Sequence, residues 1–377
     1  MTDTRIALFF DGFDQGGIGR VNLTLASAML REGLHVDLLV FHTDGPRCDE
    51  VPVGARIIDL AGKGGLSLIV ALGRYIRATP SLQGMIVSNV LLAPHVGLAA
   101  RLFRRPHLPI LCVQHGDLRR YSVNSTGFGA AARRWLTVKA GFLLSVRLAA
   151  VSDGTRHSVA ETLKISPMKV EVMGNPVVLA TPGDSIPGGM LEWWKASGNI
   201  SLLAVGRMTP MKGFESLIEA VDLLREQAEV RLVIVGSGPH QSVLERLVEG
   251  RGLSGYVRFA GYVPQPRKYY EEADVFILAS KTEAFALSLV EAMSVGTQVV
   301  ATDCDHGPCE ILDGGRFGRL VPVGDPVALK DGVLATIEDP VDSKSLLLRA
   351  SEYSTTKILE RYLKQLRLDY LLQWEQR

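Results

Sequence analysis

Two glutamates in the C-terminal half have a spacing suited to holding a long polar ligand. Glu283 and Glu291 are eight residues apart, which is about 12 Å if the segment between them is helical throughout. A nucleotide-sugar has a similar reach from its sugar ring to its ribose. One carboxylate could therefore accept hydrogen bonds from sugar hydroxyls and the other from ribose hydroxyls. For either glutamate alone, a solvated helix charge is the simpler interpretation.

The residues around these glutamates predict a helix between two strands. The helix is expected over Ala284–Val295 and ends before Gly296. Apolar runs of strand length flank it at Val275–Ala279 and Gln298–Ala301, which indicates a β-loop-α-β unit of a parallel sheet. The start of such a helix offers three free N–H groups to an anion. These groups belong to Phe285, Ala286 and Leu287.

Two cations follow an earlier predicted strand in the same half. Arg207 and Lys212 lie in the loop after Ser201–Val205, five residues apart. Cations in such a loop can hold a diphosphate and stabilise its negative charge as it leaves. The alternative is a basic loop without a ligand.

The N-terminal half has a glycine-rich loop after its first predicted strand, Arg5–Phe10. Gly16 and Gly17 would let the backbone approach a phosphate closely, with a helix start behind them. A plain tight turn explains the same residues. Arg20 could add a charge to the ligand or simply be a charge of the helix.

One histidine of this half stands where open α/β sheets place their sites. His115 directly follows the predicted buried strand Pro109–Gln114, and ligands bind at the carboxyl ends of such strands. A structural histidine bonded to the backbone is the alternative. His95 and His107 are the competing candidates.

Together these motifs resemble the retaining, GT-B-fold glycosyltransferases of family 4. The run E-A-F-A-L-S-L-V-E-A-M-S-V-G-T from Glu283 resembles the family's E-x7-E motif, and G-R-M-T-P-M-K-G from Gly206 resembles its diphosphate-binding loop. The resemblance implies that Glu283 meets the donor sugar and Glu291 the ribose. It also implies that His115 lies beside the reacting sugar.

The resemblance extends these roles to backbone contacts with the donor. Gly16 and Gly17 match the family's glycine loop and are expected to contact donor or acceptor, and the backbone near Val263 is expected to lie by the base. Arg207 and Lys212 would hold the diphosphate. The expected donor-binding and catalytic residues are Gly16, Gly17, His115, Arg207, Lys212, Val263, Glu283, Phe285, Ala286, Leu287 and Glu291.

The resemblance covers nearly the whole chain and implies an α/β architecture of two doubly wound, Rossmann-like domains facing each other across a cleft. We expect an acceptor-binding domain over residues 1–178 and a linker rich in Gly, Pro and Ser over 179–199. A nucleotide-sugar-binding domain is expected over 200–353. The last helix, in 354–377, could cross back to the first domain.

The implied reaction transfers a hexosyl or N-acetylhexosaminyl group from a nucleotide diphosphate sugar, with UDP expected over GDP, and retains the anomeric configuration. The expected acceptor is a lipid-linked saccharide in cell-envelope, exopolysaccharide or lipopolysaccharide synthesis. The leaving diphosphate would help to deprotonate the acceptor hydroxyl. Four alternatives stay open: a glycosyltransferase with a small soluble acceptor, a nucleotide-sugar epimerase, a phosphorylase with pyridoxal on a lysine such as Lys281, and an inactive binding subunit.

An acidic loop raises the question of a metal. Asp303 and Asp305 form a D-x-D pair, with His306 and Glu310 close behind, and oxygen ligands of this kind suit hard cations. The GT-B family does not normally need a metal, so a loop or helix-cap role is expected. We expect neither a metal nor another cofactor.

Composition limits the class of protein. The chain has 377 residues, 47% hydrophobic and 21% charged, with a net charge of +1, which argues against a dedicated nucleic-acid binder. Its four cysteines form no C-x-x-C pair, and Met1–Arg5 leads directly into a strand. No run of about 18 apolar residues is present. We therefore expect free thiols, no signal peptide, no membrane span and a cytoplasmic location.

The charge is unevenly distributed. Residues 1–178 carry a net +7 and the remainder −6. Residues 101–147 contain nine Lys and Arg against one acid, Asp117, and 130–146 mixes apolar residues with Arg133, Arg134, Lys139, Trp135 and Phe142. Such a helix could lie on an anionic bilayer at the inner face of the cell membrane. A helix packed on the sheet with solvated arginines is the equal alternative.

Overall fold

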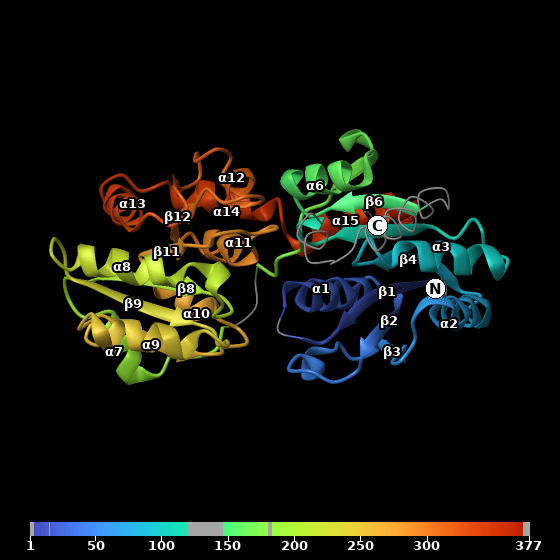
Figure 1. Ribbon diagram of the computed structural model, residues 1–377, viewed down its shortest axis with the longest axis horizontal. Coiled ribbons are helices and arrows are strands. Elements are labelled where there is room, and N and C mark those ends of the chain that lie inside the picture. Colours follow the sequence, from blue (N-terminus) through green and yellow to red (C-terminus); the bar gives the residue numbers. More distant parts are fainter. Residues whose placement is uncertain (1–3, 15, 119–145, 180–182, 372–377) are drawn as a thin grey trace, which may run out of the picture. The chain divides into compact units, whose positions relative to one another are not determined.

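The computed structural model describes residues 4–14, 16–118, 146–179 and 183–371. The chain divides into two compact units (Figure 1). Unit 1 contains Met1–Pro176 and Thr355–Arg377, and unit 2 contains Val177–Ser354. The basic segment 130–146 and its aromatic residues lie almost entirely outside the described residues.

Unit 1 is built on a seven-stranded parallel sheet with the order β3-β2-β1-β4-β5-β6-β7. The strands are β1 (Arg5–Gly12), β2 (His35–His42), β3 (Arg56–Asp59), β4 (Leu82–Val87), β5 (Ile110–Gln114), β6 (Val146–Ala150) and β7 (Val170–Val172). The helices of unit 1 are α1 (Gly17–Arg31), α2 (Gly65–Ala78), α3 (Ala93–Leu102), α6 (Asp153–Leu163) and α15 (Thr355–Leu366). Two 3₁₀ turns, η1 (Cys48–Glu50) and η2 (Pro167–Lys169), complete the described elements.

Unit 2 is built on a six-stranded parallel sheet with the order β10-β9-β8-β11-β12-β13. The strands are β8 (Ile200–Val205), β9 (Val230–Val235), β10 (Val257–Gly261), β11 (Val275–Leu278), β12 (Gln298–Thr302) and β13 (Arg319–Val321). Its helices are α7 (Gly188–Trp194), α8 (Phe214–Leu224), α9 (Gln241–Gly250), α10 (Arg267–Glu272), α11 (Leu287–Met293), α12 (Pro308–Ile311), α13 (Pro326–Glu338) and α14 (Ser343–Ser351), with the 3₁₀ turn η3 (Pro210–Lys212).

Both sheets have the strand order of a doubly wound α/β domain, which confirms the predicted Rossmann-like class. The order reverses between β1 and β4 in unit 1 and between β8 and β11 in unit 2. At such a reversal the loops at the carboxyl ends of the two neighbouring strands diverge and leave a crevice for a ligand. In unit 2 these are the loops that follow β8 and β11.

The burial of the central strands explains why the sequence pattern predicts their positions. Helices cover both faces of each sheet (Figure 1), so central strands are apolar along their whole length. In β8, Leu202, Leu203 and Ala204 are all fully buried. The four cysteines are free, as predicted. Within the described ranges, no helix has the combined length and apolar character to cross a bilayer.

A buried carboxylate ties α2 to the sheet of unit 1. Asp37 on β2 is fully buried and pairs with Arg5 at 2.6 Å and Arg56 at 2.5 Å. The hydroxyl of Tyr75, on α2, donates to the same carboxylate at 2.8 Å. Burial raises the pKa of Asp37, but these three hydrogen bonds outweigh it and hold the pKa below its usual value. The helix therefore has a fixed position on the sheet.

The predicted linker over 179–199 differs from the structure. The described part of this segment belongs to unit 2 and contains α7. Trp194 is fully buried, and its indole N–H lies 3.2 Å from the Leu202 carbonyl and 3.1 Å from that of Arg231. The content of Gly, Pro and Ser in this segment predicted a linker, but buried Trp194 packs the segment against the sheet of unit 2.

The last helix, α15, belongs to unit 1. Its Arg361 donates to the Met173 carbonyl at 3.2 Å, and Arg147 on β6 donates to the Gln365 carbonyl at 2.9 Å. Leu366 packs beside Gly84 of β4. The chain thus leaves unit 1 after β7 and returns to it at Thr355.

Glycines hold the loops of unit 2 together at the carboxyl ends of its strands. Gly213 has φ +62°, and a Cβ there would lie 2.1 Å from the carbonyl oxygen of Ala279. Gly236 has φ +137°, and a Cβ there would lie 2.0 Å from the carbonyl oxygen of Gly206. Real Cβ atoms do not approach a backbone oxygen so closely, and a positive φ strains any residue other than glycine. The loops after β8, β9 and β11 are therefore in direct backbone contact.

We predict that Gly236→Ala lowers the free energy of unfolding by about 2–4 kcal/mol, since both the positive φ and the backbone clash must be relieved. Urea titration of the purified variant measures this loss. The matched control is Gly250→Ala at the end of α9, where a Cβ meets nothing within 4 Å; its stability should change by less than about 1 kcal/mol. Equal stability of both variants would contradict the close contact.

Candidate active site

The candidate site of unit 2 centres on an ion pair between two loops. Lys212 ends the loop after β8, and Glu283 lies in the loop after β11. The Lys212 Nζ and Glu283 Oε1 atoms are 2.5 Å apart. The hydroxyl of Ser280 donates to the same Oε1 at 2.6 Å. The structure thus brings together two residues that the sequence separates by 71 positions.

Local backbone contacts position this pair. Gly213, in the left-handed conformation, ends the 3₁₀ turn η3 that carries Lys212. The Lys281 N–H donates to the Met211 carbonyl at 2.8 Å, which joins the two loops directly. The Glu283 N–H donates to the Asp305 carbonyl at 3.3 Å, so the loop after β12 takes part as well. Three adjacent strand ends therefore determine where the Glu283 carboxylate lies.

The ion pair is partly accessible, so a ligand can compete for it. The side chains of Lys212 and Glu283 are 25% and 11% exposed. Arg207 is exposed, and no bond joins it to another described residue. The structure therefore brings Lys212 and Glu283 together but leaves Arg207, at the start of the same loop, with its guanidinium available.

Glu291 is not a solvated helix charge. It is 8% exposed and lies on α11. The hydroxyl of Tyr270, itself buried on α10, donates to Glu291 Oε2 at 2.8 Å. Thr297 in turn donates its hydroxyl to the Tyr270 carbonyl at 2.6 Å. The second glutamate of the motif is thus a buried carboxylate in a fixed orientation.

The predicted helix start is wrong. The helix α11 begins at Leu287 and not at Ala284, and it ends at Met293. Ala286 has φ +70°, in the left-handed region, which breaks the helix before Leu287. Phe285 and Ala286 consequently lie in the preceding loop, and only Leu287 belongs to the helix. The separation of about 12 Å between the glutamates assumed continuous helix and does not apply.

The left-handed alanine marks a conformation that the surroundings impose. A residue other than glycine costs about 1–2 kcal/mol in the left-handed conformation. Residues with strained backbone conformations of this kind cluster at functional sites. The neighbouring Phe285 is buried and packs edge-on against Tyr353, with ring centroids 5.2 Å apart. This packing holds the loop between Glu283 and Glu291 in its compact form.

The remaining donor-side candidate, Val263, follows β10 and is half-buried. The loops after β9 and β10 are joined because the Gly236 N–H donates to the Gly261 carbonyl at 2.7 Å. Val263 thus lies two residues after Gly261, in the loop after β10, and its expected position by the base stays a prediction.

The glycine loop of unit 1 forms the start of α1. Gly16 is the N-cap residue and Gly17 the first residue of the helix. The Gly16 N–H donates to Asp14 Oδ1 at 2.9 Å, and a Cβ on Gly16 would lie 2.9 Å from the same oxygen. Arg20 is half-buried on α1 and has a partner. These glycines thus form a helix start, and their expected contact with donor or acceptor stays a prediction.

His115 follows β5 as predicted, at the carboxyl end of the strand, and is half-buried. Burial lowers the pKa of His115 to about 4, and an interaction with the side chain of Asn175 opposes this shift in part. The ring is therefore neutral at neutral pH. Of the competing histidines, His95 lies on α3 and His107 is exposed in a turn before β5.

The acidic loop after β12 contributes through its backbone. Asp303 and Asp305 are exposed, and the Asp305 carbonyl accepts the Glu283 N–H. Among the described residues, no group of three or more His, Cys, Asp or Glu side chains is arranged to hold a metal ion. His306 has φ +67° and reverses the chain before α12.

Sequence reasoning missed three residues that complete these sites. Ser280 and Tyr270 orient the two glutamates, and Asn175 interacts with His115. Ser280 stands three residues before Glu283 and could have been found as a local hydrogen-bond donor. Tyr270 and Asn175 lie 21 and 60 positions from their partners, and no sequence pattern connects them.

Both units of the chain are similar to known families. Residues 15–181 match the family described as Glycosyltransferase Family 4, and residues 193–356 match the family described as Glycosyl transferases group 1. The two matches together cover most of the chain and correspond closely to units 1 and 2.

Two curated relatives are similar to this chain over about half of its length. The lipopolysaccharide core biosynthesis glycosyltransferase LpsE of Rhizobium meliloti is 32% identical over 172 residues, 46% of this chain and 48% of that protein. The N-acetylgalactosamine-N,N'-diacetylbacillosaminyl-diphospho-undecaprenol 4-alpha-N-acetylgalactosaminyltransferase of Campylobacter jejuni is 29% identical over 224 residues, 57% of this chain and 58% of that protein. The chain thus spans about half the length of these relatives.

Solved structures share the fold over nearly the whole chain. A glycosyltransferase from Rickettsia africae superposes with a TM-score of 0.78 at 17% identity, covering 99% of this chain and 100% of that one. Anabaena Alr3699/HepE, solved in complex with UDP, superposes with a TM-score of 0.74 at 17% identity, covering 97% and 99%. With a family match on each unit and this shared fold, the chain belongs to the GT-B-fold glycosyltransferases of family 4 type.

Proposed function

We propose that this chain transfers a hexosyl or N-acetylhexosaminyl group from a UDP-sugar to a lipid-linked saccharide, with retention of anomeric configuration. The observation that carries the proposal is the ion pair between Lys212 and Glu283 at the topological reversal of unit 2. A cation for a diphosphate and a carboxylate for sugar hydroxyls are held in contact there, where open α/β sheets bind ligands.

Donor binding exchanges the partners of this pair. The diphosphate carries two negative charges and competes with Glu283 for the Lys212 ammonium. The exposed guanidinium of Arg207 supplies a second cation on the same loop. Once released, the Glu283 carboxylate accepts hydrogen bonds from the donor sugar, while the Ser280 hydroxyl, 2.6 Å from Oε1, keeps it oriented.

Glu291 is proposed to bind the ribose. Its Oε2 atom is held by the Tyr270 hydroxyl, so the carboxylate meets the ligand in one orientation. A carboxylate whose rotamer is already set loses little entropy when it accepts a ribose hydroxyl. The loop from Glu283 to Leu287, shaped by the left-handed Ala286, lies between the two glutamates in sequence.

The chemistry follows from charge development. As the glycosidic bond to the diphosphate breaks, negative charge grows on the leaving phosphate, and Lys212 and Arg207 stabilise it. The same phosphate accepts the proton of the attacking hydroxyl on the same face of the sugar, which gives retention. His115 of unit 1 would serve as a neutral hydrogen-bonding group, since its pKa is lowered to about 4. We propose no protein nucleophile.

Named relatives support the donor and acceptor classes. Anabaena HepE was solved with UDP and with UDP-glucose, which supports a uridine donor. The C. jejuni relative is named for an undecaprenol-linked acceptor, and the R. meliloti relative for lipopolysaccharide core synthesis. These names favour a lipid-linked acceptor in envelope polysaccharide assembly.

Donor hydrolysis and transfer should be measured with a panel of UDP- and GDP-sugars. We expect one UDP-hexose or UDP-N-acetylhexosamine to be consumed and the product to show the donor's anomeric configuration by NMR. A product with inverted anomeric configuration would rule out attack on the same face of the sugar as the leaving phosphate. Interconversion of nucleotide-sugars without acceptor would show an epimerase instead.

Removal of either cation should weaken catalysis. Lys212→Ala and Arg207→Ala should each lower kcat/KM. The loss should correspond to about 2–4 kcal/mol of transition-state stabilisation, the scale of one preorganised hydrogen-bond donor. Lys281→Ala is the matched control, because Lys281 is an exposed lysine in the loop after β11. If Lys212→Ala and Lys281→Ala have the same kinetics, the diphosphate is bound elsewhere.

Activity should survive treatment with EDTA with little loss, because Arg207 and Lys212 supply the positive charge that a divalent cation would bring to a diphosphate. Turnover before and after chelation, with Mg²⁺ or Mn²⁺ added back, measures this. A strict requirement for added metal that disappears in Asp303→Ala would show that the acidic loop after β12 is a metal site.

A further inference from the structure

We propose that the exposed face of α2 in unit 1 docks on an anionic lipid bilayer. This inference rests on the proposed function, since a lipid-linked acceptor is presented at a membrane surface. It assigns the contact to described residues of α2 and not to the basic segment 130–146.

The exposed side of α2 is a stripe of cationic and aliphatic residues. Lys63 precedes the helix, and Leu66, Val70, Arg74 and Arg77 follow at spacings of three or four, which places them on one helix face. All five are exposed. Leu66 is 77% and Val70 37% exposed, although the solvent side of such a helix is normally polar.

The opposite side of the helix is firmly packed. Leu68, Leu72 and Ile76 are buried in the core of unit 1. Tyr75 anchors the helix to Asp37 through its hydroxyl at 2.8 Å. The helix cannot rotate to bury its exposed aliphatic residues without losing these contacts. The stripe is therefore a fixed part of the protein surface.

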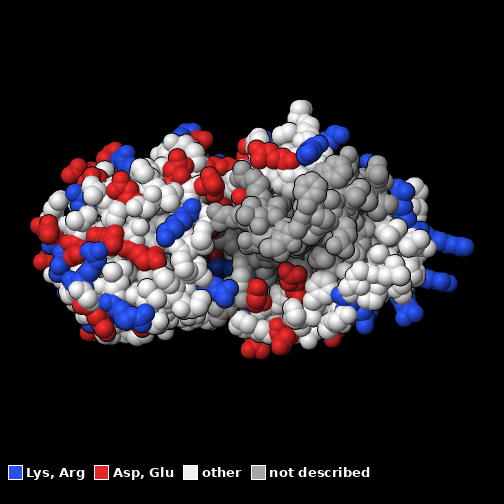
Figure 2. Space-filling model, viewed as in Figure 1, with Lys and Arg blue, Asp and Glu red and all other residues white. Residues whose placement is uncertain are grey.

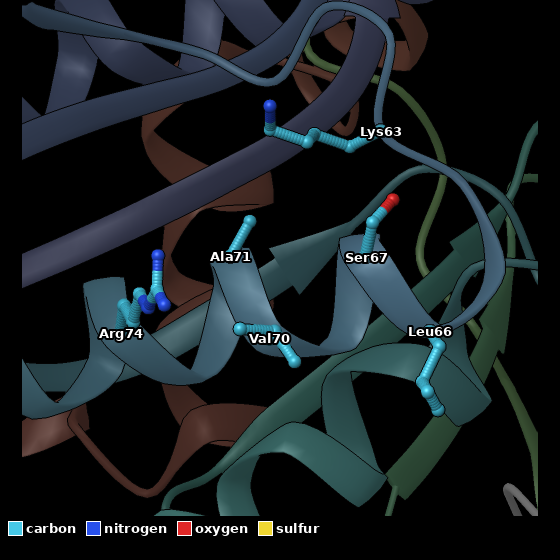
Figure 3. A pocket seen from close by; sticks show the side chains of 6 residues that line it. All are labelled: Lys63, Leu66, Ser67, Val70, Ala71 and Arg74. Atoms are coloured by element: carbon cyan, nitrogen blue, oxygen red, sulfur yellow. The ribbon is translucent and has the colours of Figure 1, made fainter.

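A pocket of about 360 Å³ opens along this stripe. Figure 3 shows the Lys63 and Arg74 side chains on the side of α2 to which Ala71 points. Neither cation forms an ion pair with a described carboxylate. A phosphate group between them would be neutralised, while Leu66 and Val70 would meet the acyl region. A phospholipid combines these two chemistries.

The charge around the stripe has one sign over a long stretch of chain. Residues 60–116 contain six Lys and Arg and no Asp or Glu. The end of unit 1 that carries α2 and α3 shows blue and white but no red in Figure 2. A bilayer with anionic lipid attracts such a surface, whereas a surface with mixed charges would be repelled in part.

The neighbouring helix α3 extends the surface. A Cβ on Gly73 would lie 2.0 Å from the Phe103 ring, so α2 and the chain after α3 are in close contact. Leu102 and Arg104, the sequence neighbours of Phe103, are also exposed, and Leu102 is 62% exposed. Aliphatic and cationic side chains thus continue beyond α2, as binding to an extended surface requires and a small ligand does not.

The experiment is co-sedimentation of the full chain with phosphatidylcholine vesicles, with and without phosphatidylglycerol, at low and high salt. We expect binding only with the anionic lipid. Arg74→Glu with Arg77→Glu should lower the partition coefficient about tenfold or more, as the loss of two surface cations predicts. Leu66→Ser with Val70→Ser should also weaken binding but leave its salt dependence intact.

The matched control is Arg246→Glu with Lys344→Glu, two exposed cations of unit 2 that give the same change in net charge. It should bind as the unchanged protein does. Absence of binding by the unchanged protein, or equal binding by the control and both α2 variants, would overturn the proposal. Loss of binding only in Arg133→Glu with Arg134→Glu would assign the contact to segment 130–146 instead.

The proposed function is tested separately, because vesicle binding involves no sugar transfer. All variants of α2 should hydrolyse donor at the normal rate and transfer normally to an acceptor dissolved in detergent. Failure of donor turnover in the unchanged protein would count against the proposed reaction and not against the docking surface. Normal thermal unfolding of the variants shows that the exposed substitutions leave the fold intact.

Discussion

The candidate site depends on backbone contacts that only glycine allows. Gly236 brings the loop after β9 against Gly206, and Gly213 brings the loop after β8 against Ala279 of the loop after β11. A Cβ at either position would lie 2.0–2.1 Å from a backbone oxygen, so a side chain there would force the loops apart. Because the loops touch, Lys212 reaches Glu283 with its Nζ atom at 2.5 Å. The geometry of the ion pair thus depends on backbone contacts of neighbouring residues, such as that between Gly213 and Ala279.

The buried and half-buried charged groups of the candidate site have partners within unit 2. Lys212 and Glu283 neutralise each other, and Glu291 is held by Tyr270. A buried or half-buried charge without a partner is costly, so under the proposed function these groups would stay paired until the donor replaces their partners. Arg207, which is exposed, has no such requirement because water solvates it.

The two units differ in how their charged residues are arranged. In unit 2, Lys212 is paired with Glu283, which would suit selective binding of one diphosphate under the proposed function. In unit 1, residues 60–116 carry no acid at all, which suits a surface that meets many phosphates at once. The hydrogen bond from Tyr75 to Asp37 would keep α2 attached to the sheet if the helix docks as proposed.

The sequence by itself determined the class of fold, the strand positions and the loops on which the candidate site residues lie. Buried parallel strands are continuous apolar runs, and the loops that follow them carry Arg207, Lys212, Glu283 and His115, so local pattern was sufficient. Only the tertiary structure decided the rest. The left-handed Ala286 shortens α11 because its surroundings impose that backbone, and an alanine within a helical pattern gives no warning of it. Trp194 joins a Gly- and Pro-rich segment to unit 2, and Tyr270 and Asn175 reach partners distant in sequence. Contacts of this kind depend on which elements the sheet order places side by side, and local sequence carries no record of that order.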